Sequence, residues 1–265
     1  MTALAVVLVT MGGALTFITP VWALLTWGSH RERKRLARLP VSRCADVTGP
    51  GPRLCAVEGR SGPGPLGTLT APLSGEPCAW YFSQVEENVS GDGPSTRVVW
   101  ESGGAMAFEV RDGSGPVLVD GRLVHPEHRS KRTGHSPPVR RVVAEDVRSA
   151  KNSAHLQGLL ARGILNEKQF RRGWLSDSLG WSVEEYVLPI GEPLHVQGRP
   201  GVRQGRPVLG EARGKHLVSG RTHVQLADAI DQDVRTGWGC LLIGSVAGPL
   251  LLVAGYLVAM AIPPG

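Results

Sequence analysis

The chain has 265 residues, of which 29 are Lys or Arg and 23 are Asp or Glu, and its formal net charge is +6. All of these charged residues lie between positions 31 and 235, so both ends of the chain are uncharged and apolar. This distribution excludes an ordinary soluble protein. A Gly plus Pro content of about 21%, without a three-residue period, excludes collagen and general disorder.

The first apolar run, residues 2–27, is predicted to form a transmembrane helix. A helix needs roughly 20 mostly apolar residues to cross the hydrocarbon core, and this run is longer than that. Trp22 and Trp27 fit the aromatic belt of a membrane interface. A cleaved signal peptide is the alternative, but it requires basic residues before the apolar run, and here they follow it.

A basic juxtamembrane segment and linker, residues 28–53, is predicted to follow this run. Its first part contains Arg31, Arg33, Lys34, Arg35 and Arg38, which we expect to contact membrane lipids. Basic residues beside a membrane helix stay on the cytoplasmic side. The central domain is therefore predicted to be cytoplasmic, with both termini on the opposite side. No nucleic-acid partner is expected, because the position of the basic run explains it without one.

The central domain, residues 54–230, contains short runs rich in β-branched and aromatic residues, separated by Gly and Pro turns. The predicted strands cover 54–60, 77–89, 97–102, 140–147, 184–191, 193–202 and 215–221. Two further strands lie within 105–121, on either side of Asp112-Gly113, which we expect to supply the positive φ of a hairpin turn. Strands and helices do not alternate, so an antiparallel sheet or barrel is predicted.

A helical insert, residues 153–172, interrupts these strands. Leu156, Leu159 and Leu160 share one face, Gly163 is expected to end the helix, and Asn166 to cap a second short helix through Phe170. We expect the insert to dock on the sheet; contact with the membrane surface or with a partner are the alternatives.

The last stretch, residues 222–238, is predicted to be a helix that leads into a second apolar run at 237–262. Leu226, Ile230 and Val234 form an apolar stripe on it. The second run is long enough to span a membrane without any charge, although a buried core helix is the alternative. The predicted fold class is therefore a membrane protein, in which two transmembrane α-helices flank a mostly antiparallel, β-rich α+β soluble domain with a short helical insert.

The four cysteines are predicted to be free thiols. The spacings between Cys44, Cys55, Cys78 and Cys240 match no zinc or thioredoxin pattern, and a cytoplasmic domain would keep thiols reduced. A Cys44–Cys55 bridge becomes plausible only with the inverted topology. Cys78 could act as a nucleophile, but a cysteine in an aromatic strand is more typical of a small core residue.

No catalytic, cofactor or metal site is predicted. His125 and His128, with His135 further on, resemble a metal site only superficially, because two prolines prevent a helical arrangement and the surroundings are typical of an exposed cationic loop. Neither a Gly-x-Ser-x-Gly elbow nor a phosphate-binding loop is present, and the Gly-rich segment 59–67 is predicted to be a surface loop.

Three segments of the central domain share a pattern of apolar, acidic and glycine positions: GEPCAWYFSQVEE, FEVRDGSGPVLVD and EEYVLPIGEPLHVQG. With the LVS at 217–219, they resemble in order the motifs of the GIDE domain, which occurs in the mitochondrial E3 ubiquitin ligase activator family and in bacterial membrane proteins. The matching positions are Pro77, Cys78, Tyr81, Glu86, Phe108, Asp112, Gly115, Val119, Glu185, Gly191, Val196 and Gly198.

The resemblance implies a mostly β domain held beside the membrane by a helix on each side. In the eukaryotic ligases, ubiquitin transfer belongs to a zinc-binding RING module after the second span. Only Pro263-Pro264-Gly265 follow that span here, so ligase activity is not expected. The cytoplasmic prediction also departs from the mitochondrial domain, which faces the intermembrane space.

The predicted function is therefore a non-enzymatic, membrane-anchored domain that binds a protein or peptide partner beside the bilayer, as a stress or signalling scaffold. Exposed strand edges are the expected binding mechanism, since an extended segment can add to a sheet. The alternatives are an E3 ubiquitin ligase-like enzyme and an accessory subunit of a membrane complex.

Among the motif residues, Asp112 is expected to be a turn residue, and Glu185 is expected to be a strand-face or hydrogen-bonding residue.

Overall fold

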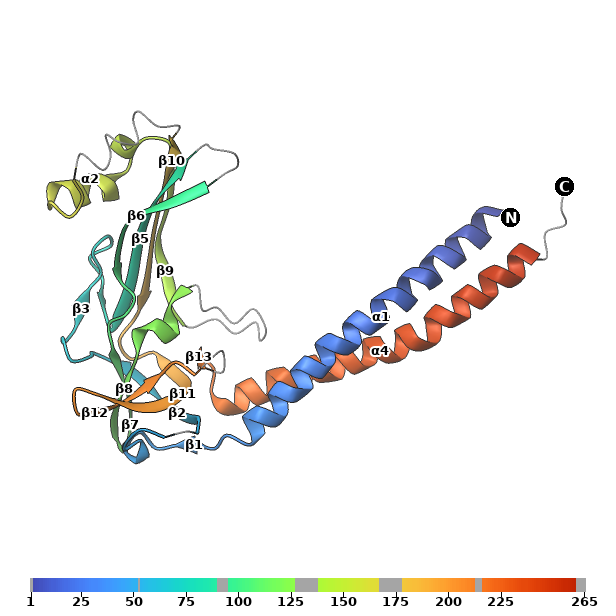
Figure 1. Ribbon diagram of the computed structural model, residues 1–265, viewed down its shortest axis with the longest axis horizontal. Coiled ribbons are helices and arrows are strands. Elements are labelled where there is room, and N and C mark those ends of the chain that lie inside the picture. Colours follow the sequence, from blue (N-terminus) through green and yellow to red (C-terminus); the bar gives the residue numbers. More distant parts are fainter. Residues whose placement is uncertain are drawn as a thin grey trace. The chain divides into compact units, whose positions relative to one another are not determined.

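The computed structural model describes residues 2–51, 53–89, 95–126, 138–166, 178–212 and 216–260. The chain forms two compact units: Met1–Pro40 with Val224–Gly265, and Val41–His223 (Figure 1). The second unit thus begins inside the segment interpreted as a linker.

Two long helices make up the first unit. Helix α1 (Thr2–Ala37) continues from the first apolar run through the basic residues, and α4 (His223–Met260) contains the second run. Each helix contains one proline, Pro20 or Pro249. Both helices are long and apolar enough to cross a membrane.

Small residues form the contact between α1 and α4, which run antiparallel. A Cβ atom added to Gly244 would lie 2.5 Å from Thr19 Oγ1, and one added to Gly248 would lie 2.9 Å from Thr16 Oγ1. The two threonine hydroxyls donate to carbonyls of their own helix, so they bring no unpaired polar group into the contact. We call this contact the Gly/Thr seam; it allows the two backbones to approach closely.

Many large apolar side chains of both helices are exposed, whereas Leu36, Leu226, Ile230 and Val234 are buried. Phe17 is 82% exposed and Leu242 is 66% exposed. Other exposed members are Val6, Val7, Met11, Ile18, Val21, Leu24, Ile243, Val246, Leu250, Val253 and Leu257. Most of the surface of this unit is therefore apolar.

The second unit is built around a closed β-barrel. Strand β2 (Cys55–Gly62) pairs antiparallel with β7 (Phe108–Asp112) along one edge and with β11 (Pro193–Arg203) along the other. The sheet continues from β7 through β8 (Gly115–Val119) and β12 (Arg206–Gly210) to β11. The order β2-β7-β8-β12-β11 therefore returns to β2. Within this ring of five described strands, β8–β12 is the only parallel pair.

Short elements complete the barrel. Strand β1 (Val41–Ser42) pairs parallel with β2, and β13 (Leu217–Ser219) pairs antiparallel with β11. The short helices are η1 (Cys44–Asp46), η2 (Gly121–Val124) and η4 (Ala150–Asn152).

A second, antiparallel sheet has the order β6-β5-β10-β9. Its strands are β5 (Trp80–Val89), β6 (Ser95–Gly103), β9 (Arg140–Val147) and β10 (Ser178–Leu188), and the hairpin of β3 (Leu69–Thr70) and β4 (Pro77–Cys78) precedes it. One core joins the barrel to this sheet, because Trp80 and Phe82 pack with Val57 and Val196 of the barrel.

Helix α2 (Ala154–Ala161) docks on the four-stranded sheet, as the sequence predicts. The Ser153 hydroxyl caps it by accepting the Leu156 N–H at 3.1 Å. Leu156 and Leu159 are fully buried in a cluster that includes Val85 and Val183 of the sheet.

The structure confirms the β-rich α+β fold with two long apolar helices, and it corrects several details. Positive φ falls on Gly115, at 149°, and not on Asp112 or Gly113, so the predicted turn chemistry is wrong. Strand β10 begins at Ser178, earlier than the predicted 184, and β1, β3 and β12 were not predicted. The second helix of the insert, through Phe170, and the histidines at 128 and 135 lie outside the described residues.

We expect Gly248→Leu to force α1 and α4 apart, because a leucine side chain would overlap Thr16. Overpacking of this kind costs about 1–3 kcal/mol. Double electron–electron resonance between spin labels at Val7→Cys and Tyr256→Cys, in a Cys240→Ser background, should give a longer or broader distance distribution. Gly239→Leu is the matched control, because nothing lies within 4 Å of a Cβ atom at that position. Equal distributions in both variants would contradict the seam.

Candidate functional site

Three of the family-motif positions belong to the core. Phe108, Val119 and Val196 are fully buried and lie in the cluster that fills the barrel. The motif segment 217–219 forms β13, whose three residues are buried against β11. These positions therefore act in packing.

Glu185 holds a loop against the four-stranded sheet. Its carboxylate is fully buried and accepts the backbone N–H groups of Leu73 and Ser74, each at 2.8 Å. The Ser83 hydroxyl donates a third hydrogen bond at 2.7 Å. A buried carboxylate with three donors is a structural clamp, because the donors would be unsatisfied without it.

Cys78 lies beneath the same loop. It is fully buried, and its Sγ is 3.8 Å from the Leu69 carbonyl oxygen. Burial, aided by the charges of Glu185 and Glu76, raises the pKa of the thiol to about 11. A thiol that stays protonated at neutral pH is a poor nucleophile, so the geometry agrees with the core interpretation of Cys78.

Asp112 connects the β7–β8 turn to η1. Its carboxylate accepts the N–H groups of Ser114 at 2.7 Å and Gly115 at 3.1 Å, and also the N–H of Cys44 at 2.9 Å. Hydrogen bonds from Ser114 and Cys44 keep the pKa of this carboxyl far below its usual range. Asp112 is thus a turn residue, as predicted, and it also anchors the chain before β2.

Two motif glycines, Gly191 and Gly198, meet different local requirements. Gly191 has φ +87°, its N–H donates to the Ser61 carbonyl at 2.8 Å, and its own carbonyl accepts from Arg60 at 2.8 Å. A Cβ atom added to Gly198 would lie 2.9 Å from the Gly210 oxygen. Gly191 thus supplies the positive φ of the turn before β11, and Gly198 lets β11 approach β12 closely.

The remaining motif residues lie nearer the surface. Pro77 is exposed at the start of β4. The Tyr81 hydroxyl lies 3.3 Å from Ser102 Oγ, and Glu86 accepts from the Gln84 amide at 2.7 Å. The structure therefore brings Cys78 and Glu185 together, but it distributes the motif positions over several local contacts and does not collect them in one cleft.

A buried polar group that the sequence analysis missed lies between β2 and β11. The His195 Nδ1 is 3.2 Å from the Glu58 carboxylate, which also accepts the backbone N–H of His223 at the start of α4. Gln197 Nε2 lies 3.0 Å from His195 Nε2. With Nδ1 donating to Glu58, Nε2 is an acceptor for this amide, so the contacts fit a neutral imidazole. Strand alternation gives no signal for this group, because β11 is buried on both faces here.

Burial lowers the pKa of His195, and the nearby Glu58 opposes this effect only in part. The side chain is fully buried, so it is closed to a substrate from solvent. This group therefore holds β2, β11 and His223 to one another.

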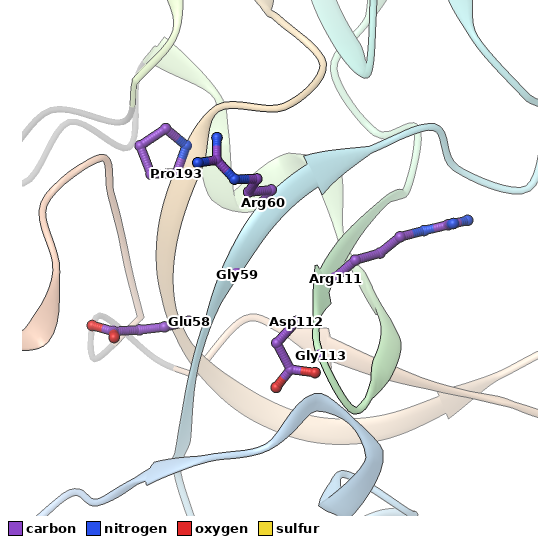
Figure 2. A pocket seen from close by; sticks show the side chains of 7 residues that line it. All are labelled: Glu58, Gly59, Arg60, Arg111, Asp112, Gly113 and Pro193. Carbon is purple, nitrogen blue, oxygen red and sulfur yellow. The ribbon is translucent and has the colours of Figure 1, made fainter.

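A surface pocket of about 450 Å³ is lined by Glu58, Gly59, Arg60, Arg111, Asp112, Gly113 and Pro193. Figure 2 shows that its ionic side chains diverge: Glu58 and Arg111 point away from each other, and Asp112 points toward neither. Arg60 donates to Gly191, and Arg111 pairs with Glu109 at 2.6 Å. Groups that diverge and already have partners do not form a catalytic constellation.

The four-stranded sheet has one face with partly exposed polar side chains, which we call the open face. Its face opposite α2 carries Gln84 and Glu86 of β5 and Ser182 and Glu184 of β10, all partly exposed. Both edge strands contain one extra residue, Val99 in β6 and Val142 in β9. Such bulges twist an edge and limit regular pairing, so the open face suits a partner better than the edges do.

The five basic residues after the first apolar run have different surroundings. Arg33 forms a two-point ion pair with Asp231 of α4, at 2.5 and 3.0 Å. Arg31 lies over the Trp27 ring, 5.1 Å from its centroid. Lys34 and Arg38 are exposed, whereas Arg35 is partly buried. The five residues therefore differ in their contacts, and their expected contact with membrane lipids stays a prediction.

All four cysteines are unpaired. Within the described part of the chain, no three His, Cys, Asp or Glu residues are grouped so that they could hold a metal ion. His125 instead packs its ring on Phe82, with centroids 4.2 Å apart.

Comparison with known proteins yields no match to a family model, a curated protein or a solved structure.

We predict that Glu185→Gln lowers the free energy of unfolding by about 1–3 kcal/mol, because an amide cannot accept from all three donors. Glu184→Gln is the matched control: Glu184 is partly exposed, pairs with Arg141, and should contribute less than about 1 kcal/mol. Thermal unfolding of the full chain in detergent, followed by near-UV circular dichroism, measures both. A Glu185→Gln variant as stable as the Glu184→Gln control would contradict the proposed structural role of Glu185.

We also predict that acidification destabilises the second unit through His195. Its folded pKa lies below the unfolded value of about 6.5, so between these values the unfolded state binds more protons. Stability is complete above pH 6.5 and falls below it, by at most about 1.4 kcal/mol per pH unit for one proton.

Urea titrations between pH 5 and pH 8 measure this effect. The slope should be smaller in His195→Gln than in the wild type. A wild-type protein that gains stability as the pH falls through 6.5 would contradict the prediction.

Proposed function

We propose that this protein is a membrane-anchored, non-enzymatic, GIDE-like domain that binds a protein or peptide partner beside the bilayer. The main support for a membrane anchor is the arrangement of α1 and α4. Small residues of the two helices face each other, and many of the large apolar residues, such as Phe17 and Leu242, are exposed. Lipid is the solvent that suits this surface, and close packing through small residues is typical of helices in a bilayer.

The proposed side of the domain is the cytoplasm. The excess of Lys and Arg next to the polar end of α1, together with Arg235 on α4, supports this orientation. Both chain ends would then lie on the other side of the membrane.

The proposed binding surface is the open face of the four-stranded sheet. The opposite face is covered by α2, whereas Glu86 and Glu184 on the open face are partly exposed. A polar sheet face with half-exposed side chains offers many hydrogen-bonding groups to a protein partner.

The GIDE-like assignment draws support from the roles of the motif residues. Glu185, Asp112 and Gly191 each hold a turn, and Phe108 fills the core. Motif positions that form structure are what a shared fold requires, whatever the activity.

A promiscuous biotin ligase tests the orientation and the partner together, because this enzyme needs cytoplasmic ATP. Inserted at the exposed β11–β12 turn, at Gln204–Gly205, it should biotinylate a reproducible set of proteins in cells. Fused to the N-terminus, it should label nothing above background.

An unrelated two-span protein carrying the same ligase is the control for random cytoplasmic labelling. The proposal fails if the insertion labels only what this control labels, and the orientation is reversed if the N-terminal fusion is the active one.

A further inference from the structure

The basic residues of α1 fall into two sets according to the helical period. Trp27, Arg31 and Lys34 follow one another at spacings of four and three residues, so they share one face of the helix, and Arg38 lies in the turn directly after α1 ends at Ala37. Arg33 lies on a different face, where it forms its two-point ion pair with Asp231. The positive charge of Arg33 is therefore neutralised by Asp231 of the other helix.

The other set has exposed side chains. Arg31, Lys34 and Arg38 are exposed, and none of them forms an ion pair with a described residue. We call these three residues the cationic stripe. The stripe continues a face that is apolar nearer the N-terminus, where Leu24 is 71% exposed and Trp27 is 59% exposed.

Helix geometry places the stripe at the level of lipid headgroups if Trp27 marks the interface. At 1.5 Å per residue, Arg31 lies about 6 Å and Lys34 about 10 Å beyond Trp27 along the axis. Helical side chains lean toward the N-terminus, which here is the direction of the apolar segment. The two cations nearest Trp27 can thus reach back into a headgroup layer of roughly 5–8 Å per leaflet.

We propose that the cationic stripe binds the phosphate groups of anionic lipids in the leaflet beside the β-rich unit, with Arg31 contributing most and Arg38 least. Guanidinium groups pair with phosphate through two parallel hydrogen bonds, and the Trp27 ring holds Arg31 in place. Arg33 takes no part in this binding. The inference rests on the proposed membrane anchor and adds a lipid preference to it.

The test uses the full chain reconstituted into phosphatidylcholine vesicles that contain a trace of spin-labelled lipid. Electron paramagnetic resonance gives the fraction of label held at the protein surface, with either phosphatidylglycerol or phosphatidylcholine as the labelled lipid. At low salt, the wild type should prefer phosphatidylglycerol, on the order of fivefold, and the preference should shrink as salt is added.

The triple variant Arg31→Gln, Lys34→Gln, Arg38→Gln should lose this preference, and Arg31→Gln alone should lose more than Arg38→Gln alone. The double variant Arg33→Gln, Asp231→Asn is the matched control and should keep the wild-type ratio. A triple variant with the wild-type ratio, or a control that loses it, would overturn the inference.

Flotation of the vesicles separates this result from a failure of the anchor. Protein that does not float with the vesicles after alkaline extraction refutes the proposed function itself. Protein that floats but shows no lipid preference refutes only the cationic stripe.

Discussion

Strand β2 is the constraint on which the β-rich unit depends, because it closes the barrel by pairing along both of its edges. The same strand also holds other parts of the chain. The Ser61 hydroxyl donates to the Pro189 carbonyl at 2.6 Å and accepts the Glu192 N–H at 2.9 Å, and Arg60 donates to Gly191. Glu58 holds His195. Loss of β2 would therefore open the ring and release the turn before β11 together.

The two-sided pairing explains a local requirement of the sequence. Gly59 lies where β7 crosses β2, and a Cβ atom there would overlap the Arg111 backbone carbonyl. The absence of a side chain lets the two strands approach at this point. Carboxylates then hold segments that are not paired in a sheet. Glu185 accepts the backbone N–H of Leu73 in the loop before β4, and Asp112 accepts the backbone N–H of Cys44 in η1. Two acidic residues at motif positions, Glu185 and Asp112, thus act as acceptors for backbone N–H groups.

Local features of the fold could be predicted from the sequence, and long-range contacts could not. Ser153 before an apolar helical run identifies the start of α2, and a short run with β-branched residues identifies β9 at its observed bounds. The Glu58–His195 contact joins residues 137 positions apart, and Arg33 and Asp231 are 198 apart. Nothing in local spacing selects one such pair among many, because the pairing follows from which strands become neighbours. The sequence pattern selects the positions that resemble a motif, but only the structure separates their roles.

The arrangement of α1 and α4 is the reverse of what water would select. In an aqueous protein, helices bury their largest apolar side chains, since burial of apolar area is the main favourable term. Here Gly244 and Gly248 occupy the contact, while Phe17 is 82% exposed. Turning the large residues inward would gain hydrophobic free energy in water but nothing in lipid, where close packing of small residues remains favourable. The Gly/Thr seam is therefore a stronger argument for a lipid environment than the length of either apolar run, which a buried core helix could also reach.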